Sequence, residues 1–494
     1  MAIFSKSRGP SDTVIGGMNP TQAVWCGVAL LTLVRLWYAC RYDLIPDEAY
    51  YWVWSKHFAL SYRDKGPLVA WTISLGTAIF GDTVFGVRFF AVVLSVGTAY
   101  QLYRLAQRLY DEATALWCLG VTALIPLLCI GSILMTIDPL SVFFWAWGAN
   151  LSWSGIETGK VRYWFLAGAA VGLGFLAKFT NAMQLVCIAL FLSWSRPHRR
   201  FLLSRQSLAM LLGFGLCSLP VFIWNLQTGW LHVLALADRS GLDRSLVFKP
   251  KEFFKYVGAE LGVLTPLFLV GMVVAAIALW RNQSHETRVK FLLTQFLPIQ
   301  GICLLLSLNS RVLPNWIAPT LLPGTILLVA YWRPLFERDP KWRTPVWIAL
   351  GLGLVVTLLL HLASWFPIPA KYDPLHKAEG WTDFAQQVQR VREEHKANLL
   401  IANYYNQASM MQFYLPDHPV TYLPPARYGD TEFTLWPGYT VTDGTRALYV
   451  VDQHPWLSDK VKDQFKQSRL VHEFWAKFHG RPIEHFFIFL LWNE

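Results

Sequence analysis

Long apolar segments recur along the first three quarters of the chain, each close to the length of a membrane-spanning helix. The first runs from Ala23 to Cys40, and the last, Val346 to Trp365, is interrupted only by His361. A helix that crosses the hydrocarbon core of a bilayer needs about 20 apolar residues, with a range of about 17 to 25. The pattern therefore predicts a polytopic α-helical membrane protein.

Eleven segments are predicted as spans, at about 23–40, 84–103, 113–133, 140–155, 163–177, 182–195, 207–224, 256–280, 291–308, 316–332 and 345–366. The apolar stretch from Pro67 to Phe80 has only 14 residues. This length is short for a span and typical of an interfacial or re-entrant helix. We therefore expect external interfacial helices in addition to the spans, and we see no internal repeat.

Basic residues follow the positive-inside rule if the N-terminal Lys6 and Arg8 are cytoplasmic. The inner loops then hold Arg104, Arg108, Lys160, Arg162, Arg196, Arg199, Arg200, Arg205, Arg281, Arg288, Lys290, Arg333, Arg338, Lys341 and Arg343. The same topology places the segment from Arg41 to Lys65 outside. Asp138 and Lys178 are then expected at the same outer membrane face.

The pattern changes after about residue 367. Trp381, Phe384, Val388 and Val391 are spaced three and four apart, as on one face of a helix. Strand-like segments follow at 398–402, 420–423 and 447–452, helix-like segments at 407–415 and 460–466, and a final apolar run at 485–492 that is too short to span. This alternation predicts a small external α/β domain over 367–494, after a transmembrane domain over 1–366.

Composition agrees with a membrane protein: 54% of the 494 residues are hydrophobic, and the mean hydropathy is +0.34. The net charge of +11 lies largely in short loops, where topology explains it, so we expect no nucleic-acid partner. The seven cysteines fall in or beside apolar segments without metal-ligand spacing. They predict neither a disulfide framework nor a metal site.

Adjacent carboxylates, Asp47 and Glu48, follow the first predicted span in the motif DEAYYW. One interpretation is structural, because an acid at a helix start caps the helix and complements its dipole. The other is functional: acids beside anionic headgroups are electrostatically unfavourable unless they serve a substrate. The sequence alone leaves both interpretations open.

Asp138 and Lys178 also have two interpretations. Asp138 precedes a proline at the start of an apolar segment, as a helix cap would, and Lys178 could extend along a helix end towards water. However, many cations are expected on the outer side, where the positive-inside rule does not place them: Arg63, Lys65, Lys178, Arg239, Arg244, Lys249, Lys251, Lys255 and Arg311. They indicate either an anionic ligand such as a lipid phosphate or contact with bulk anionic lipid. Arg35, Glu260 and His361 lie within spans and are not assigned to the site.

The ordered motifs DEAYYW, DKGPLVAW, TIDPL and GLGFLAKFTN resemble the membrane-embedded GT-C glycosyltransferases of family 39/83 type. That family includes bacterial relatives of protein O-mannosyltransferases and the transferases of aminoarabinose and galacturonic acid to lipid A. The resemblance covers residues 20–200 and extends, more weakly, to 314–324 and 403–424. Two departures are Gly66, where many relatives have a second proline, and the absence of an arginine near Tyr50, which argues against aminoarabinose as the sugar.

The resemblance implies transfer of a sugar from a polyprenyl-phosphate donor, with inversion, at the outer face of a bacterial inner membrane. By matching position it implies catalytic roles for Asp47, Glu48 and Asp138. Lys65 and Lys178 would hold the donor phosphate, and Tyr51 would line the site; Arg63 and Arg311 are further substrate-binding candidates among the external cations.

We therefore predict a glycosyltransferase whose acceptor is a lipid, a glycan or a protein. No phosphate-binding or dinucleotide-binding fingerprint is present. The three acids could hold a divalent ion, but we expect no cofactor, since the family motifs imply relatives that mostly work without metal. A transporter or lipid flippase is the alternative, although its charges should line a path at the membrane midplane. A membrane-anchored scaffold is the third hypothesis.

Overall fold

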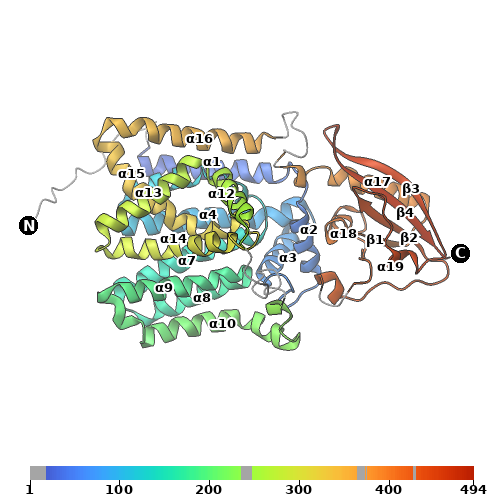
Figure 1. The fold of residues 1–494 in the computed structure, drawn as a ribbon, viewed down its shortest axis with the longest axis horizontal. Coiled ribbons are helices and arrows are strands. Elements are labelled where there is room, and N and C mark those ends of the chain that lie inside the picture. Colours follow the sequence, from blue (N-terminus) through green and yellow to red (C-terminus); the bar gives the residue numbers. More distant parts are fainter. Residues whose placement is uncertain (1–17, 235–247, 364–372, 374, 427–429, 494) are drawn as a thin grey trace, which may run out of the picture.

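The computed structural model describes residues 18–234, 248–363, 373, 375–426 and 430–493. Figure 1 shows a bundle of nearly parallel helices, a sheet domain at the opposite end of the molecule, and α2 and α3 between them. Lys6, Arg8, Arg239, Arg244 and the expected domain boundary at 366/367 lie outside the described residues.

The bundle contains α1 (Pro20–Ala39), α4 (Val84–Leu109), α5 (Glu112–Thr122), α6 (Pro126–Gly131), α7 (Ile137–Thr158), α8 (Val161–Ala177), α9 (Met183–Trp194), α10 (Arg205–Gln227), α12 (Pro250–Leu264), α13 (Pro266–Gln283), α14 (Thr287–Ser307), α15 (Leu321–Arg338) and α16 (Arg343–His361). In the described chain, six segments are long and apolar enough to cross a bilayer: α1, α4, α10, α13, α14 and Pro340–His361, which contains α16. The structure confirms an apolar helical bundle. The count of eleven spans stays a prediction.

Two expected spans are interrupted in the structure. The segment at 113–133 forms α5 and α6, because the chain turns before Pro126, which begins the second helix. The segment at 256–280 forms α12 and α13, which separate at Thr265, where φ is 66° and Pro266 follows. Hydropathy does not detect these breaks, since both sides of each remain apolar, and the prolines alone mark them.

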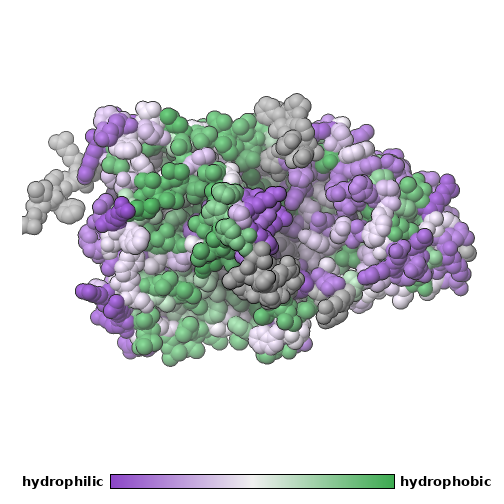
Figure 2. All heavy atoms as spheres, in the orientation of Figure 1, coloured by the Kyte–Doolittle hydropathy of each residue, from purple (hydrophilic) through white to green (hydrophobic). Residues whose placement is uncertain are grey.

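The expected inner loops meet at one end of the bundle. Arg108 at the end of α4 pairs with Glu157 at the end of α7, at 2.6 Å. Arg333 in α15 pairs with Asp111 before α5. Arg288 in α14 donates to the carbonyl oxygen of Leu109 at 3.1 Å. Between this end and the sheet domain, Figure 2 shows a hydrophobic belt over the helices, as a bilayer requires.

Two short helices lie at the end of the bundle that faces the sheet domain: α2 (Pro46–Lys56) and α3 (Leu68–Phe80). Helix α3 has 13 residues and is too short to be counted among the spans, in agreement with an interfacial helix. Gly66 precedes it, and a Cβ atom there would collide with the backbone carbonyl of Leu176 in α8. Any side chain at position 66 would therefore require this part of α8 to move.

The C-terminal domain has one mixed sheet of order β1-β2-β4-β3. Its elements are α17 (Trp381–Glu394), β1 (Leu399–Ala402), α18 (Tyr405–Tyr414), β2 (Arg446–Asp452), α19 (Asp459–Lys462), β3 (Gln467–Phe478) and β4 (Arg481–Trp492). Strands β1 and β2 are parallel, and β4 is antiparallel to both β2 and β3. A small C-terminal domain with a sheet is confirmed, whereas its bounds at 367–494 and its external location stay predictions. The expected strand at 420–423 forms only an isolated bridge between Tyr422 and Ile401.

One hydrophobic core joins the C-terminal domain to the membrane part. It contains Trp52 of α2, Ile73 of α3 and Leu140 of α7 together with Phe384 of α17 and Met411 of α18. Because most side chains of α2 are buried in this core, the C-terminal domain holds α2 in place. Strand faces alternate, so the other face of the sheet packs a separate core around Tyr449 and Val461.

Candidate functional site

Asp47 lies in the first turn of α2 and is accessible, but protein atoms surround its recess. Burial in this recess raises the pKa of the Asp47 carboxyl group. Lys65 and Lys377 oppose the rise, whereas the nearby acids Glu48 and Asp138 add to it. Asp47 is not the helix cap, since Ile45 occupies that position. It is therefore an accessible carboxyl group near two amines, with an increased proton affinity.

Tyr51 lies one helical turn after Asp47 and is buried. The pKa of its hydroxyl group is raised well above the ordinary value, first by burial and then by Asp47 and Asp138. Both carboxylates therefore disfavour ionisation of the Tyr51 hydroxyl group, which means that this side chain of α2 lies near Asp138 at the start of α7. The structure thus brings Asp47, Tyr51, Lys65 and Asp138 into one cluster.

Asp138 and Lys178 form a buried ion pair whose third member is Asn315. The amine of Lys178 donates to Asp138 Oδ1 at 2.8 Å and to the carbonyl oxygen of Asn315 at 2.9 Å. The amide of Asn315 donates to Asp138 Oδ2 at 2.8 Å. The cap of α7 is Thr136, so Asp138 is not engaged in capping. An ammonium group has three N–H donors, and the third donor of Lys178 is not used in these two bonds.

Glu48 is fully buried and occupied by structural contacts. Arg88, which is 1% exposed, binds its carboxylate through Nε at 2.9 Å and Nη2 at 2.7 Å. The backbone N–H groups of Met135 and Ile45 also donate to Glu48. Arg88 further donates to the carbonyl oxygens of Ala39, Tyr42 and Asp43. This geometry favours a structural role for Glu48, which ties α1, α2, α4 and the segment before α7 together.

Arg63 faces the C-terminal domain. Its guanidinium group pairs with Asp64 at 2.8 Å, and its backbone N–H donates to Glu432 at 2.6 Å. The N–H of Glu432 donates to the hydroxyl oxygen of Tyr50 at 3.0 Å. Glu432 thus fastens the segment that carries Lys65 to α2. Burial, and to a lesser extent Asp64, raise the pKa of Glu432 to about 8, although the Arg63 contacts oppose this.

Burial of the Glu432 carboxyl group is expected to make the stability of the protein fall as pH rises. Between the ordinary pKa of 4.5 and about 8, the unfolded chain ionises at this position while the folded chain keeps its proton. The free energy of unfolding therefore falls with pH in this window. Glutamine cannot ionise, so Glu432→Gln should remove this part of the pH dependence of the free energy of unfolding. The measurement is thermal unfolding of the purified protein at pH 5 to 8.5. The exposed Glu394→Gln is the matched control, and an unchanged pH slope in Glu432→Gln would contradict the assignment.

Arg311 lies in a different recess, beside Lys249 and Lys255. The structure therefore separates it from the cluster around Asp47. In contrast, Lys377 and Asn315 belong to the cluster but were not assigned from the sequence. Lys377 lies outside all the motifs on which the family resemblance depends. Asn315 lies in the weaker part of the resemblance, at 314–324, where only its side-chain amide would have suggested a site.

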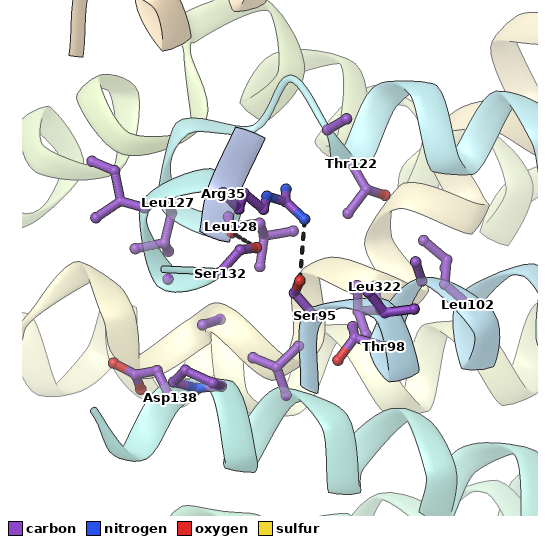
Figure 3. A pocket seen from close by; sticks show the side chains of 18 of the residues that line it. Arg35, Ser95, Thr98, Leu102, Thr122, Leu127, Leu128, Ser132, Asp138 and Leu322 are labelled. Atoms are coloured by element: carbon purple, nitrogen blue, oxygen red, sulfur yellow. Dashed lines mark hydrogen bonds between the residues drawn. The ribbon is translucent and has the colours of Figure 1, made fainter. Parts of the chain in front are cut away.

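A cavity of about 260 Å³ extends from Asp138 into the bundle. Its walls come from α1, α4, α5, α6, α7 and α15 and are mainly apolar. Figure 3 shows Arg35 within it, donating to Ser95 Oγ at 3.2 Å, with Asp138 at the start of α7. The shape suits an apolar chain attached to a polar group near Asp138.

Within the described residues, no group of three or more His, Cys, Asp and Glu side chains could hold a metal ion. Each acid near Asp47 also has its own partners: Glu48 binds Arg88, and Asp138 binds Lys178. Independence from metal stays a prediction.

Known proteins match this chain in both sequence and fold. Residues 64–224 match the family described as dolichyl-phosphate-mannose-protein mannosyltransferase. Lipid A galacturonosyltransferase RgtD of Rhizobium johnstonii is 27% identical over 66% of this chain and 67% of its own. The undecaprenyl phosphate-alpha-4-amino-4-deoxy-L-arabinose arabinosyl transferase of Pseudomonas aeruginosa is 32% identical over 58% of this chain. That match spans 54% of the relative's length.

The fold is shared with solved structures of ArnT from Cupriavidus metallidurans. The apo structure has a TM-score of 0.63 and the complex with undecaprenyl phosphate a TM-score of 0.66. Both align with 95% of this chain and 98% of ArnT at 14% identity, which shows the fold alone. Together, the sequence relatives and this fold make the chain similar to GT-C membrane glycosyltransferases of the ArnT and protein-mannosyltransferase type.

Proposed function

We propose that the protein transfers a sugar from a polyprenyl-phosphate donor to a lipid acceptor at the outer face of a bacterial inner membrane. The observation that carries this proposal is the accessible Asp47, which lies close enough to Lys65, Lys377 and Asp138 for each of them to affect its pKa, with Asp138 paired to Lys178. The names of the relatives support the substrate classes, since they act on lipid A or use an undecaprenyl-phosphate sugar.

Asp47 is the proposed general base. Its carboxylate accepts the proton of the acceptor hydroxyl group as the acceptor oxygen bonds to the anomeric carbon. The bond from that carbon to the donor phosphate breaks, and the electron pair leaves with the polyprenyl phosphate. Attack on the face opposite the leaving group inverts the anomeric centre. The raised pKa of Asp47 suits this role, because a base works best when its pKa approaches the working pH.

Amines stabilise the leaving phosphate in this proposal. Charge grows on the phosphate oxygens as the bond breaks, and pre-positioned cations lower the energy of that state. Lys65 lies beside Asp47. Lys178 is held by Asp138 and Asn315 with a third N–H available for a ligand. Asp138 then acts by positioning Lys178, and its two oxygens already accept bonds.

In this proposal, the donor's hydrocarbon chain binds in the cavity shown in Figure 3. This cavity begins at Asp138 and is lined by leucines, valines and alanines, with Arg35 inside. An isoprenoid chain would cover these apolar walls, and binding would be stabilised by roughly 25 cal/mol for each Å² of apolar surface removed from water. The phosphate would then remain near Lys178, at the mouth of the cavity.

Mass spectrometry of lipids from cells with and without the protein tests the proposed function. We expect one lipid class to gain the mass of a sugar residue only when the protein is present, which identifies both sugar and acceptor. Purified protein supplied with the corresponding polyprenyl-phosphate sugar should reproduce the same product. Lipid movement across liposomes without any sugar transfer would instead support a flippase.

A further inference from the structure

A second recess lies outside the acidic site, beside α12. It has a volume of about 640 Å³ and is lined by Lys249, Glu252, Lys255, Tyr256 and Arg311, with the loop 312–314. Lys255 donates to Glu252 at 2.6 Å, so these two charges compensate each other. Lys249 and Arg311 form no ion pair with any residue that the structure describes. The recess therefore carries an excess positive charge that an anionic group can neutralise.

Side chains of α12 place this recess at the level of lipid headgroups. Phe248 and Phe254 are each 71% exposed, while Lys251 and Lys255 on the same segment are also exposed. Aromatic and basic residues combine in this way where a helix lies at a membrane interface. Figure 2 shows a hydrophilic patch beside α12, where the hydrophobic belt ends. The recess is thus open to a lipid that approaches within the membrane plane.

One loop forms a wall of both the recess and the acidic site. Arg311 and Pro314 line the recess, and the next residue, Asn315, donates to Asp138. The start of α12 is fixed to the end of α14, because the Lys249 N–H donates to the Leu308 carbonyl oxygen at 2.6 Å. Four residues of chain reach at most about 14 Å, so the Cα atoms of Arg311 and Asn315 are no farther apart than this. A group bound in the recess is therefore within one lipid headgroup of the acid cluster.

We propose that this recess binds a phosphate-bearing headgroup of the acceptor lipid, which makes the acceptor an anionic glycolipid. The inference rests on the proposed function, in which Lys65 and Lys178 already serve the donor phosphate. A second anion requires cations of its own. Arg311 and Lys249 supply two, and with Lys255 they outnumber Glu252, the one acid that lines the recess among the described residues and that interacts with both Lys255 and Arg311. Guanidinium groups bind phosphate through paired N–H donors.

Binding of lipid A to the full-length protein in neutral detergent tests the inference without any donor or turnover. We expect Lys249→Gln/Arg311→Gln to weaken binding of bisphosphorylated lipid A at least about tenfold, as loss of charged hydrogen bonds predicts. Dephosphorylated lipid A should bind the wild type about as weakly as bisphosphorylated lipid A binds this variant. If the double variant does not fold, the single variant Arg311→Gln takes its place. Arg311→Lys keeps the positive charge and should bind lipid A more tightly than Arg311→Gln.

The matched control for Arg311→Gln is Lys251→Gln, which removes one positive charge from α12 outside the recess and should change binding less than twofold. An equal loss in Lys251→Gln would overturn the proposal in favour of general attraction to anionic lipid. Equal competition by phosphatidylglycerol would overturn the acceptor assignment as well. In transfer assays, the recess variants should raise the KM for the acceptor and leave the KM for the donor unchanged. A protein that binds lipid A through the recess but transfers no sugar would refute the proposed function alone.

Discussion

Replacing Asp47 by asparagine is expected to lower the rate of sugar transfer by about 10²- to 10⁴-fold, the usual contribution of a positioned general base. Asparagine has nearly the same shape but cannot accept the proton of the acceptor hydroxyl group. Because Asp47 is accessible and is not the cap of α2, the fold should be retained. The measurement is initial transfer by purified protein, with thermal unfolding as the check on folding.

The pH profile separates a base from a residue that only shapes the site. Transfer by the wild type should rise with pH as the Asp47 carboxyl group loses its proton, at a pH above its ordinary range because burial raises its pKa. Asp47→Asn should lose this rise. Asp443→Asn is the control, since the side chain of Asp443 is 94% exposed in the C-terminal domain. Near wild-type turnover in Asp47→Asn would remove Asp47 from the chemistry.

Glu48→Ala is expected to destabilise the protein by about 3–5 kcal/mol, as breaking a buried ion pair does. Glu48 is 0% exposed and Arg88 1%, so the variant leaves a buried guanidinium charge without its carboxylate. The N–H of Met135 also loses its acceptor. The measurement is thermal or denaturant unfolding in detergent, with transfer activity recorded in parallel.

An exposed ion pair provides the comparison for Glu48. Arg392 and Asp417 pair at 2.7 Å, and the side chain of Asp417 is 54% exposed. Asp417→Ala should therefore cost no more than about 1 kcal/mol. A double variant with methionine at both 48 and 88 should be less destabilised than Glu48→Ala, because no unpaired charge remains. Loss of transfer in Glu48→Ala without loss of stability would return Glu48 to a catalytic role.

The architecture could be predicted from the sequence because lipid-facing helices appear as long apolar segments and the loops on one side of them are rich in basic residues. It also predicted most of the C-terminal domain, where buried strands such as β2 are strongly apolar. Strand β3 was missed because it lies at the sheet edge, where most of its side chains are exposed or half-buried and its pattern is polar.

At the proposed site, motif order pointed to Asp47, Asp138, Lys65 and Lys178, but spacing could not separate an accessible acid from a paired one. Glu48 and Asp47 are neighbours in sequence, yet α2 turns one into the core and leaves the other open. That difference depends on Arg88, which is 40 residues away in the chain. Likewise, Lys377 reaches Asp47 only through the docking of the C-terminal domain on α2.

That docking also sets when the enzyme becomes competent during its synthesis. Tyr50, close to Asp47 near the start of the chain, receives a hydrogen bond from the N–H of Glu432, which the ribosome adds 382 residues later. The entire helical bundle is therefore inserted before the walls around Asp47 are complete. A chain that ended before Glu432 would lack both its hydrogen bond to Tyr50 and the part of the shared core that packs on α2.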